Sequence, residues 1–274
     1  IKPVCYFSYK AKLKQLNDKF FLHTTAIIAI IKGQKEVLAA MLLVLDVGNT
    51  NIKMGIYHRD CLSFQARLST DRFKTADEYA VEFSTVFQVY KVPVEKITGV
   101  IIGSVVPQIT SALRNAMQTL TGASPMVVGP GIKTGLNIKI NNPATTGADL
   151  VASCVAASEL YPCPCIVFAL GTATTISVLD KDGAMLGGSI LPGVGISLNA
   201  LTAKSALLSA ISLEAPEKVI GKNTEDCMRS GSVLGTASML DGMYTRIEQE
   251  LGACCSAVAT GGFANVIIPS CHRR

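Results

Sequence analysis

The chain has 274 residues, a length that favours one large domain or two of modest size. Hydrophobic residues make up 49% of it and charged residues only 16%, which is the composition of a globular chain with a sizeable buried core. The formal net charge of +5 comes from scattered basic residues, without a run of Lys and Arg interleaved with aromatic residues. The charge therefore predicts a mildly basic surface and argues against nucleic-acid binding.

The nine cysteines and three histidines limit which metal and redox sites the sequence can form. The Cys-Pro-Cys at 163–165 and the Cys-Cys at 254–255 lack the spacing of a zinc ribbon or a thioredoxin motif. No His pair has metal-ligand spacing, which argues against a His-based metal site. We therefore predict a cytoplasmic protein in which most cysteines are buried, reduced thiols.

Residues 1–40 mix basic, aromatic and apolar residues and precede the first strong strand signal at Met41. The apolar run at 26–31 is too short to span a bilayer and has no small-residue cleavage site, so we expect neither a membrane partner nor a signal peptide. We expect the folded protein to start at Met41, with 1–40 a non-native or poorly ordered extension. The alternative is a genuine N-terminal helix.

From Met41 onward, three predicted strands are followed by alternating helices and strands. The expected strands cover 42–47, 52–57, 61–69, 97–107 and 125–129, and the expected helices cover 76–92, 109–122 and 147–161. Asp77 and Glu78 favour the first turn of a helix, Pro107 is expected to end its strand, and Gly122 to end its helix.

The same order starts again near residue 163. Strands are expected at 165–170, 173–180, 184–191 and 255–262, and helices at 196–209 and 224–252. This internal repeat predicts two α/β domains, 41–162 and 163–274, that face each other across a cleft.

Each predicted repeat opens with a strand that leads into a turn of small residues. In the first repeat Asp46 precedes Gly48, Asn49 and Thr50, and in the second the turn covers 171–175. Such turns offer N–H groups and hydroxyls that can hold phosphate oxygens, whereas a carboxylate can hold Mg²⁺ that bridges phosphates. Asp46 is therefore a candidate Mg²⁺ ligand, and the next three named residues are candidate phosphate donors. Plain turn chemistry stays open for the first turn taken alone.

Two further features bear on a nucleotide site. A third glycine turn at 259–262 suits the close approach of a flat adenosine. Asp149 lies at the start of the predicted helix 147–161, where a carboxylate can accept the proton of a substrate hydroxyl or can simply stabilise the helix N-terminus. The P-loop pattern G-x-x-x-x-G-K-[ST] does not occur in the sequence.

Taken together, these motifs resemble the type III pantothenate kinases, which belong to the fold group of acetate and sugar kinases, heat-shock ATPases and actin. The resemblance runs from 41 to about 270 and rests on DVGNTNIKMG (46–55), GSVVP (103–107), GPGIKTG (129–135), GAD (147–149), GTATT (171–175), LGGSILPG (186–193) and TGG (260–262). It implies two ribonuclease-H-like domains of the actin-like ATPase type that face each other across a nucleotide cleft.

The resemblance also implies an activity, its cofactors and its site residues. The activity is ATP-dependent phosphorylation of pantothenate to 4′-phosphopantothenate, the first step of coenzyme A biosynthesis, by a cytoplasmic homodimer that uses Mg²⁺ and a monovalent cation, K⁺ or NH₄⁺. Asp149 is implied as the general base and Asp46 as the Mg²⁺ ligand. The residues implied to contact ATP or its phosphates are Asp46, Gly48, Asn49, Thr50, Asn51, Lys53, Gly171, Thr172, Thr174, Gly261 and Gly262. Those implied to bind pantothenate are Gly147, Ala148, Asp149, Leu150, Ile140 and Ser205.

Four positions depart from the family pattern. Leu150 stands where the family has an Arg that resembles a clamp for the pantothenate carboxylate, and Ile140 stands where an aromatic residue with a hydroxyl is usual. Ala169 replaces an Asp that resembles a cation-associated group, so the departure argues against a monovalent cation site there. Ser205 replaces a Thr contributed by the dimer partner and keeps its hydroxyl. The family pattern also continues past residue 274, so we expect a truncated second domain with exposed apolar surface.

Three hypotheses follow. The chain is an active pantothenate kinase with a modified pocket, a catalytically impaired nucleotide-binding or regulatory relative, or a kinase for another small alcohol that lacks a carboxylate. Nucleotide binding without turnover would favour the second, and ADP release with a neutral alcohol would favour the third.

Overall fold

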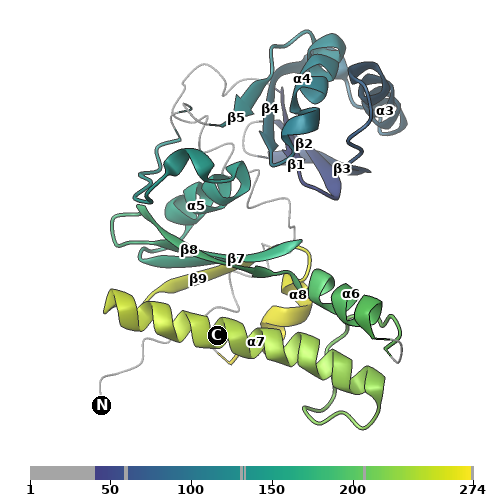
Figure 1. Ribbon diagram of the computed structural model, residues 1–274. Coiled ribbons are helices and arrows are strands. Elements are labelled where there is room, and N and C mark those ends of the chain that lie inside the picture. The colour runs from purple at the N-terminus through teal and green to yellow at the C-terminus, as the bar shows by residue number, and fades with distance from the viewer. Residues whose placement is uncertain (1–40, 59–60, 130–131, 133, 206–207, 273–274) are drawn as a thin grey trace. The chain divides into compact units, whose positions relative to one another are not determined.

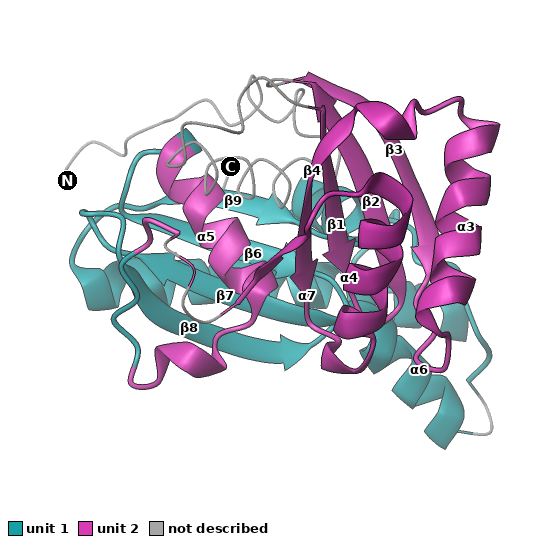
Figure 2. Ribbon diagram, turned by 90° about the horizontal axis from the view of Figure 1, so that it is seen from above, with its two compact units in different colours: residues 1–19, 137–140, 160–274 teal, residues 20–136, 141–159 magenta. Residues whose placement is uncertain are grey.

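The computed structural model describes residues 41–58, 61–129, 132, 134–205 and 208–272. The predicted extension 1–40 lies outside the described residues. The described residues form two compact units, the first made of 41–136 and 141–159 and the second of 137–140 and 160–272 (Figure 2). The domain boundary between 162 and 163 stays a prediction.

The first unit is built on a five-stranded sheet with the order β3-β2-β1-β4-β5 (Figure 1). The strands are β1 (Met41–Val47), β2 (Asn51–His58), β3 (Cys61–Ser69), β4 (Ile97–Ser104) and β5 (Met126–Val128). β1 pairs antiparallel with β2 and parallel with β4, and this central position explains its continuous apolar run. β3, at an edge of the sheet, alternates between exposed and half-buried residues because successive side chains of a strand point to opposite faces.

Helices α3 (Ala76–Val89) and α4 (Pro107–Thr121) pack together against this sheet (Figure 1). Phe83 of α3 and Leu113 of α4 share one buried core with Leu43 of β1. α3 begins at a capping box, in which the side chains of Thr75 and Glu78 each bond the other's backbone N–H. The apolar faces of both helices thus pack against one face of the sheet, which every second residue of β1 lines.

The other set of alternating residues in β1 joins a second, smaller apolar cluster. Leu42 and Val44 contribute to it, and Ala148 packs against it. Ala148 is the first residue of α5 (Ala148–Leu160), which follows the short 3₁₀ turn η2 (Pro143–Thr145). The second set of alternating residues in β1 thus belongs to the cluster against which the start of α5 packs.

The second unit repeats the order and pairing of the first four strands of the first unit, and its described residues include no counterpart of β5. Its sheet has the order β8-β7-β6-β9 and consists of β6 (Cys165–Leu170), β7 (Ala173–Leu179), β8 (Met185–Pro192) and β9 (Ser256–Thr260). β6 pairs antiparallel with β7 and parallel with β9, as β1 does with β2 and β4. The predicted internal repeat and the α/β fold of the actin-like ATPase type are thereby confirmed. The cleft between the two domains stays a prediction.

Three helices complete the second unit: α6 (Val194–Lys204), α7 (Thr224–Leu251) and α8 (Ala264–Ile267). Val233 of α7 and Ile267 of α8 are buried with Ile166 of β6, and Figure 1 shows α7 running along the sheet. Asn223 caps the first turn of α7, and Gly252 ends the helix in the left-handed conformation. The remaining short 3₁₀ turns are η1 (Val94–Lys96) and η3 (Ile268–Ser270).

Three predicted boundaries were wrong by three or more residues, and one was confirmed. α3 ends at Val89 instead of at 92. β4 ends at Ser104, and Pro107 begins α4 instead of ending a strand, because proline fits the first helical turn, where its missing N–H is not needed. The helix predicted at 196–209 ends at Lys204, and Ser205 is extended. Gly122 ends α4 with a φ of 70°, as predicted.

Eight of the nine cysteines lie within the described residues, and all eight are free thiols. The buried ones are Cys154, Cys165, Cys255 and Cys271, and the exposed ones are Cys61, Cys227 and Cys254. Burial raises the pKa of Cys165 to about 12 and that of Cys255 to about 11. These two thiols stay neutral at physiological pH, as expected for structural cysteines, whereas the prediction that most cysteines are buried holds for half of those described.

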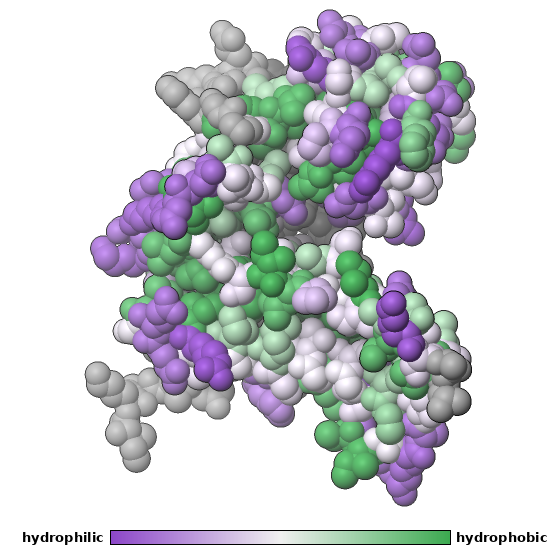
Figure 3. Space-filling model, viewed as in Figure 1, coloured by the Kyte–Doolittle hydropathy of each residue, from purple (hydrophilic) through white to green (hydrophobic). Residues whose placement is uncertain are grey.

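Apolar side chains also reach the surface, as the green areas of Figure 3 show. The most exposed large apolar residues are Phe73 in the first unit and Ile190, Val219 and Ile220 in the second. Among the described helices, none combines the length and the apolar character needed to cross a bilayer.

Candidate active site

The first candidate phosphate turn connects β1 to β2. Asp46 is the second-last residue of β1 and faces Lys53 across the antiparallel pair. The Lys53 Nζ donates to the Asp46 Oδ2 at 3.0 Å, and the Asp46 side chain is only 14% exposed. Strand register therefore pairs the acidic residue with a cation, because residues directly opposite in antiparallel strands lie side by side.

The turn is closed by one of its own backbone groups. The Gly48 N–H donates to the Asn51 carbonyl at 3.0 Å. Asn49 and Thr50 are exposed, and their N–H groups have no hydrogen-bond partner among the residues that the structure describes. Gly48 therefore shapes the turn, whereas Asn49 and Thr50 offer backbone donors to a ligand.

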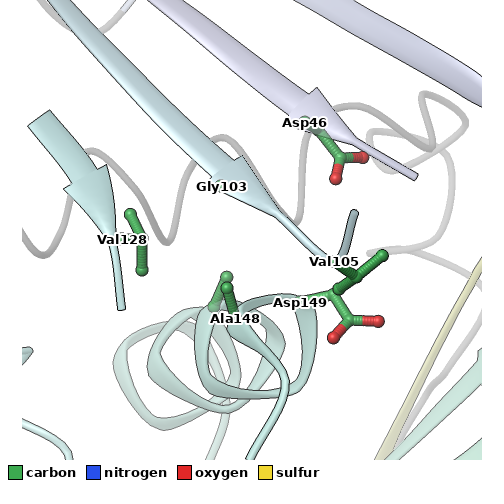
Figure 4. Close-up of a pocket in the computed structure, with 7 residues that line it drawn as sticks. Asp46, Gly103, Val105, Val128, Ala148 and Asp149 are labelled. Atoms are coloured by element: carbon green, nitrogen blue, oxygen red, sulfur yellow. The ribbon is translucent and has the colours of Figure 1, made fainter. Parts of the chain in front are cut away.

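The start of α5 lies at the carboxyl ends of β1, β4 and β5, which is the edge where open α/β sheets bind ligands. A small hollow there is lined by Asp46, Gly103, Val105, Val128, Ala148, Asp149 and Ala152 (Figure 4). Its volume of about 10 Å³ has room for roughly one water molecule. Figure 4 shows Asp46 at the end of β1 and Asp149 at the start of α5, with Val105 between them in this view. Two of the predicted acidic residues thus line one hollow.

Asp149 has a different environment from Asp46. Its carboxylate is half-buried and forms no ion pair with any side chain in the described part of the chain. Gly147 makes room for it, because a Cβ at that position would lie 2.5 Å from the Asp149 Oδ1. The first turn of α5 also favours a negative charge. Asp149 is therefore a carboxylate that can accept a proton, whereas Asp46 is paired with Lys53.

The second candidate phosphate turn connects β6 to β7 in the other unit. The Gly171 N–H donates to the Ala173 carbonyl at 3.0 Å, and the Thr172 carbonyl accepts the Gly193 N–H at 3.1 Å. Thr174 is 1% exposed, and its hydroxyl has no hydrogen-bond partner within the described ranges. A buried hydroxyl without a partner costs free energy, so a ligand or water oxygen would complete this turn.

The third glycine turn packs against the end of the same strand, β6. Gly261 has a φ of 100°, and a Cβ there would lie 2.4 Å from the Leu170 carbonyl oxygen. The Phe263 N–H donates to that carbonyl at 3.1 Å, and Gly262 is exposed. The structure therefore brings the predicted adenosine turn and the second phosphate turn together within one unit, and only glycine fits at 261.

The predicted pantothenate residues lie on several elements. Leu150 is half-buried in the first turn of α5. Ile140 belongs to the second unit, where its Cγ2 would lie 3.8 Å from a Cβ at Gly187 of β8. Ser205 follows α6 in an extended conformation. None of the three can supply the positive charge that would hold a carboxylate.

The described residues suit one of the two implied cations. Mg²⁺ in nucleotide sites commonly takes one or two carboxylates together with phosphate oxygens, and Asp46 offers such a carboxylate beside the exposed donors of the first turn. Ala169 offers only a methyl group, with Thr175 and Thr260 as its strand partners, so its side chain cannot ligate a monovalent cation. Within the described ranges, no cluster of three or more His, Cys, Asp or Glu could hold a metal ion alone.

Comparisons of the sequence with known proteins point to one family. The profile of a family described as type III pantothenate kinase matches residues 42–246. A type III pantothenate kinase of Moorella thermoacetica is 42% identical over 229 residues, which are 84% of this chain and 90% of that protein. Those of a Roseiflexus species and an Exiguobacterium species are 42% and 43% identical, each over 83% of this chain and 89% of the relative. The chain belongs to the type III pantothenate kinase family.

Sequence reasoning missed several residues that surround the predicted ones. Gly193 holds the second phosphate turn, and Val105 lies between the two acidic residues in Figure 4. Arg72 donates to Asn49, 23 positions earlier in the chain. The glycine at the end of LGGSILPG was a usable signal for Gly193, whereas no local pattern singles out Arg72.

Proposed function

We propose that this chain transfers the γ-phosphoryl group of ATP to the primary hydroxyl of pantothenate and forms 4′-phosphopantothenate and ADP. Family membership supports this reaction. The observation that carries it in this chain is the half-buried Asp149 carboxylate, which shares a hollow with Asp46 but has no cationic partner among the described residues. In the transfer, the hydroxyl oxygen bonds to the γ-phosphorus, the bond to the ADP oxygen breaks, and the proton passes to Asp149.

The role of Asp149 follows from the weakness of an alcohol as a nucleophile. A carboxylate within hydrogen-bond reach orients the hydroxyl and accepts its proton as the new bond forms, which typically contributes about 10²–10⁴-fold to the rate. Positioning and charge neutralisation supply most of the remaining acceleration in phosphoryl transfer. Asp46 would hold Mg²⁺, which when bound neutralises phosphate charge.

ATP would be held by the three turns. Asn49, Thr50 and Lys53 lie at the first turn and would contact phosphates, with Gly48 and Asn51 closing that turn. Gly171, Thr172 and the unpartnered hydroxyl of Thr174 would contact phosphates from the second turn. Gly261 and Gly262 would lie near the adenosine. The monovalent cation stays a prediction that the methyl group of Ala169 does not favour, so no step is assigned to it.

Pantothenate would bind near Gly147, Ala148 and Leu150, with Ile140 and with Ser205 from the partner of a homodimer. The exposed apolar residues of the second unit, including Ile190 and Ile220, are consistent with such an assembly, as are the exposed residues of α6. We also propose the cytoplasm as its location. Because Leu150 cannot pair with a carboxylate, a small neutral alcohol is the second candidate substrate.

The test compares two acceptors with the full chain, Mg²⁺-ATP and NH₄⁺. One is pantothenate, and the other is its alcohol analogue, in which a hydroxymethyl group replaces the carboxylate. We expect ADP release with pantothenate well above the rate with ATP alone. Faster release with the neutral analogue would favour the second candidate. No release with either acceptor, from a sample that binds Mg²⁺-ATP, would contradict the proposal and favour a catalytically impaired relative.

A further inference from the structure

The loop after β3 is held firmly in the first unit. Tyr79 of α3 is fully buried, and its hydroxyl donates to the Asp71 carbonyl at 2.5 Å and accepts the Asp71 N–H at 3.2 Å. The Asp71 Oδ1 accepts the Phe73 N–H at 2.9 Å. The capping box at Thr75 then starts α3. The loop is therefore anchored on both sides of Arg72.

The same loop is bonded to the first phosphate turn at three points. The Thr70 Oγ1 donates to the Gly48 carbonyl at 2.6 Å, and the Thr70 N–H donates to the Thr50 carbonyl at 3.0 Å. The Arg72 Nη2 donates to the Asn49 Oδ1 at 2.9 Å. These contacts engage the carbonyl groups and the amide oxygen of the turn, and the N–H groups of Asn49 and Thr50 have no partner among the described residues, which is the arrangement that an anion needs.

The contact between Arg72 and Asn49 fixes the orientation of the amide. A guanidinium has only donors, so the atom of Asn49 that faces it must be the oxygen. The two N–H bonds of the Asn49 side chain must then point away from Arg72. Both side chains are exposed, and the Asn49 Nδ2 has no partner among the residues that the structure describes. Arg72 thus orients the amide so that its donors face away from the guanidinium.

We propose that Arg72 is a positioning residue for ATP binding: it holds Asn49 so that the amide N–H groups of its side chain face a phosphate of Mg²⁺-ATP. This inference rests on the proposed function, because it takes the first turn as a phosphate site. The alternative is an ordinary surface hydrogen bond with no effect on nucleotide. The two differ in whether the affinity for ATP depends on Arg72 and whether that dependence passes through Asn49.

The experiment measures the Kd of Mg²⁺-ATP by calorimetry and the KM values of the kinase reaction for the full chain. Arg72→Ala is expected to raise the Kd and the KM for ATP by about tenfold, as loss of one charge-assisted hydrogen bond does. The KM for the acceptor and the thermal midpoint should change little. Arg72→Lys, a pure donor, should restore much of the affinity. Arg72→Gln should not, because glutamine can accept as well as donate. Arg114→Ala, a change at an exposed arginine of α4, is the matched control.

A double-mutant cycle tests the route of the effect. If Arg72 acts by orienting Asn49, then Arg72→Ala should cost less than about twofold in an Asn49→Ala background, since contacting residues are not additive. The same tenfold loss in that background would overturn the positioning role, and an unchanged Kd in Arg72→Ala would overturn the inference altogether. ATP binding that depends on Arg72 without turnover of pantothenate would instead contradict only the proposed function. A chain that does not bind Mg²⁺-ATP would contradict both.

Discussion

Gly261→Ala tests whether the third glycine turn is built on the end of β6. The new Cβ would lie 2.4, 2.5 and 2.6 Å from the O, C and N atoms of Leu170, which are backbone atoms within the paired strand and cannot move aside cheaply. The backbone at 261 also has a φ of 100°, which side chains rarely adopt. Strain at such a φ costs about 1–3 kcal/mol and overpacking a further 1–3 kcal/mol. We therefore expect a loss of roughly 2–6 kcal/mol, a large share of the total stability of a domain.

Urea unfolding of the full chain measures this loss as a lower midpoint. Gly242→Ala is the matched control, because Gly242 lies in α7 and its Cβ would meet nothing within 4 Å. That change should raise the stability by about 0.5–1 kcal/mol, as alanine does in helices. A Gly261→Ala protein as stable as the unchanged chain would refute the close approach of the turn to Leu170.

Three further predictions concern two positions that depart from the family pattern, Leu150 and Ala169, and the ion pair of Lys139 with Asp180. Leu150→Arg should lower the KM for pantothenate by about tenfold without lowering the KM for the neutral alcohol analogue, since it adds a partner for the carboxylate. Equal changes in the two KM values would contradict the idea that position 150 holds the pantothenate carboxylate. Ala169→Asp should make the turnover rate higher in K⁺ than in Na⁺, and equal rates in the two salts would argue against a cation site there. The hydrogen bond from Lys139, aided by backbone N–H groups, lowers the pKa of Asp180 in the folded state. The ionised Asp180 therefore stabilises the fold above the ordinary carboxyl pKa, and this stabilisation is lost as the pH falls through the lowered value. Because Lys139 is 46% exposed, Lys139→Met should lower the urea midpoint only slightly at pH 7, and an equal lowering at pH 2 would contradict this origin.

Local pattern predicted most of the fold because the two central strands, β1 and β6, are continuous apolar runs that end in small-residue turns. The repeat of that pattern was enough to predict two α/β units with a similar succession of elements along the chain, but it did not predict the order of the strands within each sheet. Pro107 was misassigned because proline both ends strands and begins helices, and only the packing of α4 decides between the two. The end of α6 was misplaced because the apolar spacing continues past Lys204 although the helix does not.

Individual contacts within the candidate site were predictable from local pattern only where the two residues are close in sequence or share a hairpin. The pairing of Asp46 with Lys53 follows from the register of β1 and β2, so the sequence already contained that signal. The contact of Arg72 with Asn49 and the approach of Gly261 to Leu170 join distant segments. Such contacts depend on the tertiary fold and leave no periodic trace in the sequence.

The claim that Asp149 accepts the substrate proton is tested most directly by the kcat of Asp149→Asn with Mg²⁺-ATP and pantothenate. Asparagine keeps the shape of the side chain but cannot accept the proton. We predict a kcat lower by about 10²–10⁴-fold with the Kd of Mg²⁺-ATP within about twofold of the unchanged chain. Asp77→Asn, at an exposed acidic residue in the first turn of α3, should leave both values unchanged. A kcat of Asp149→Asn within about threefold of the unchanged chain would contradict the account.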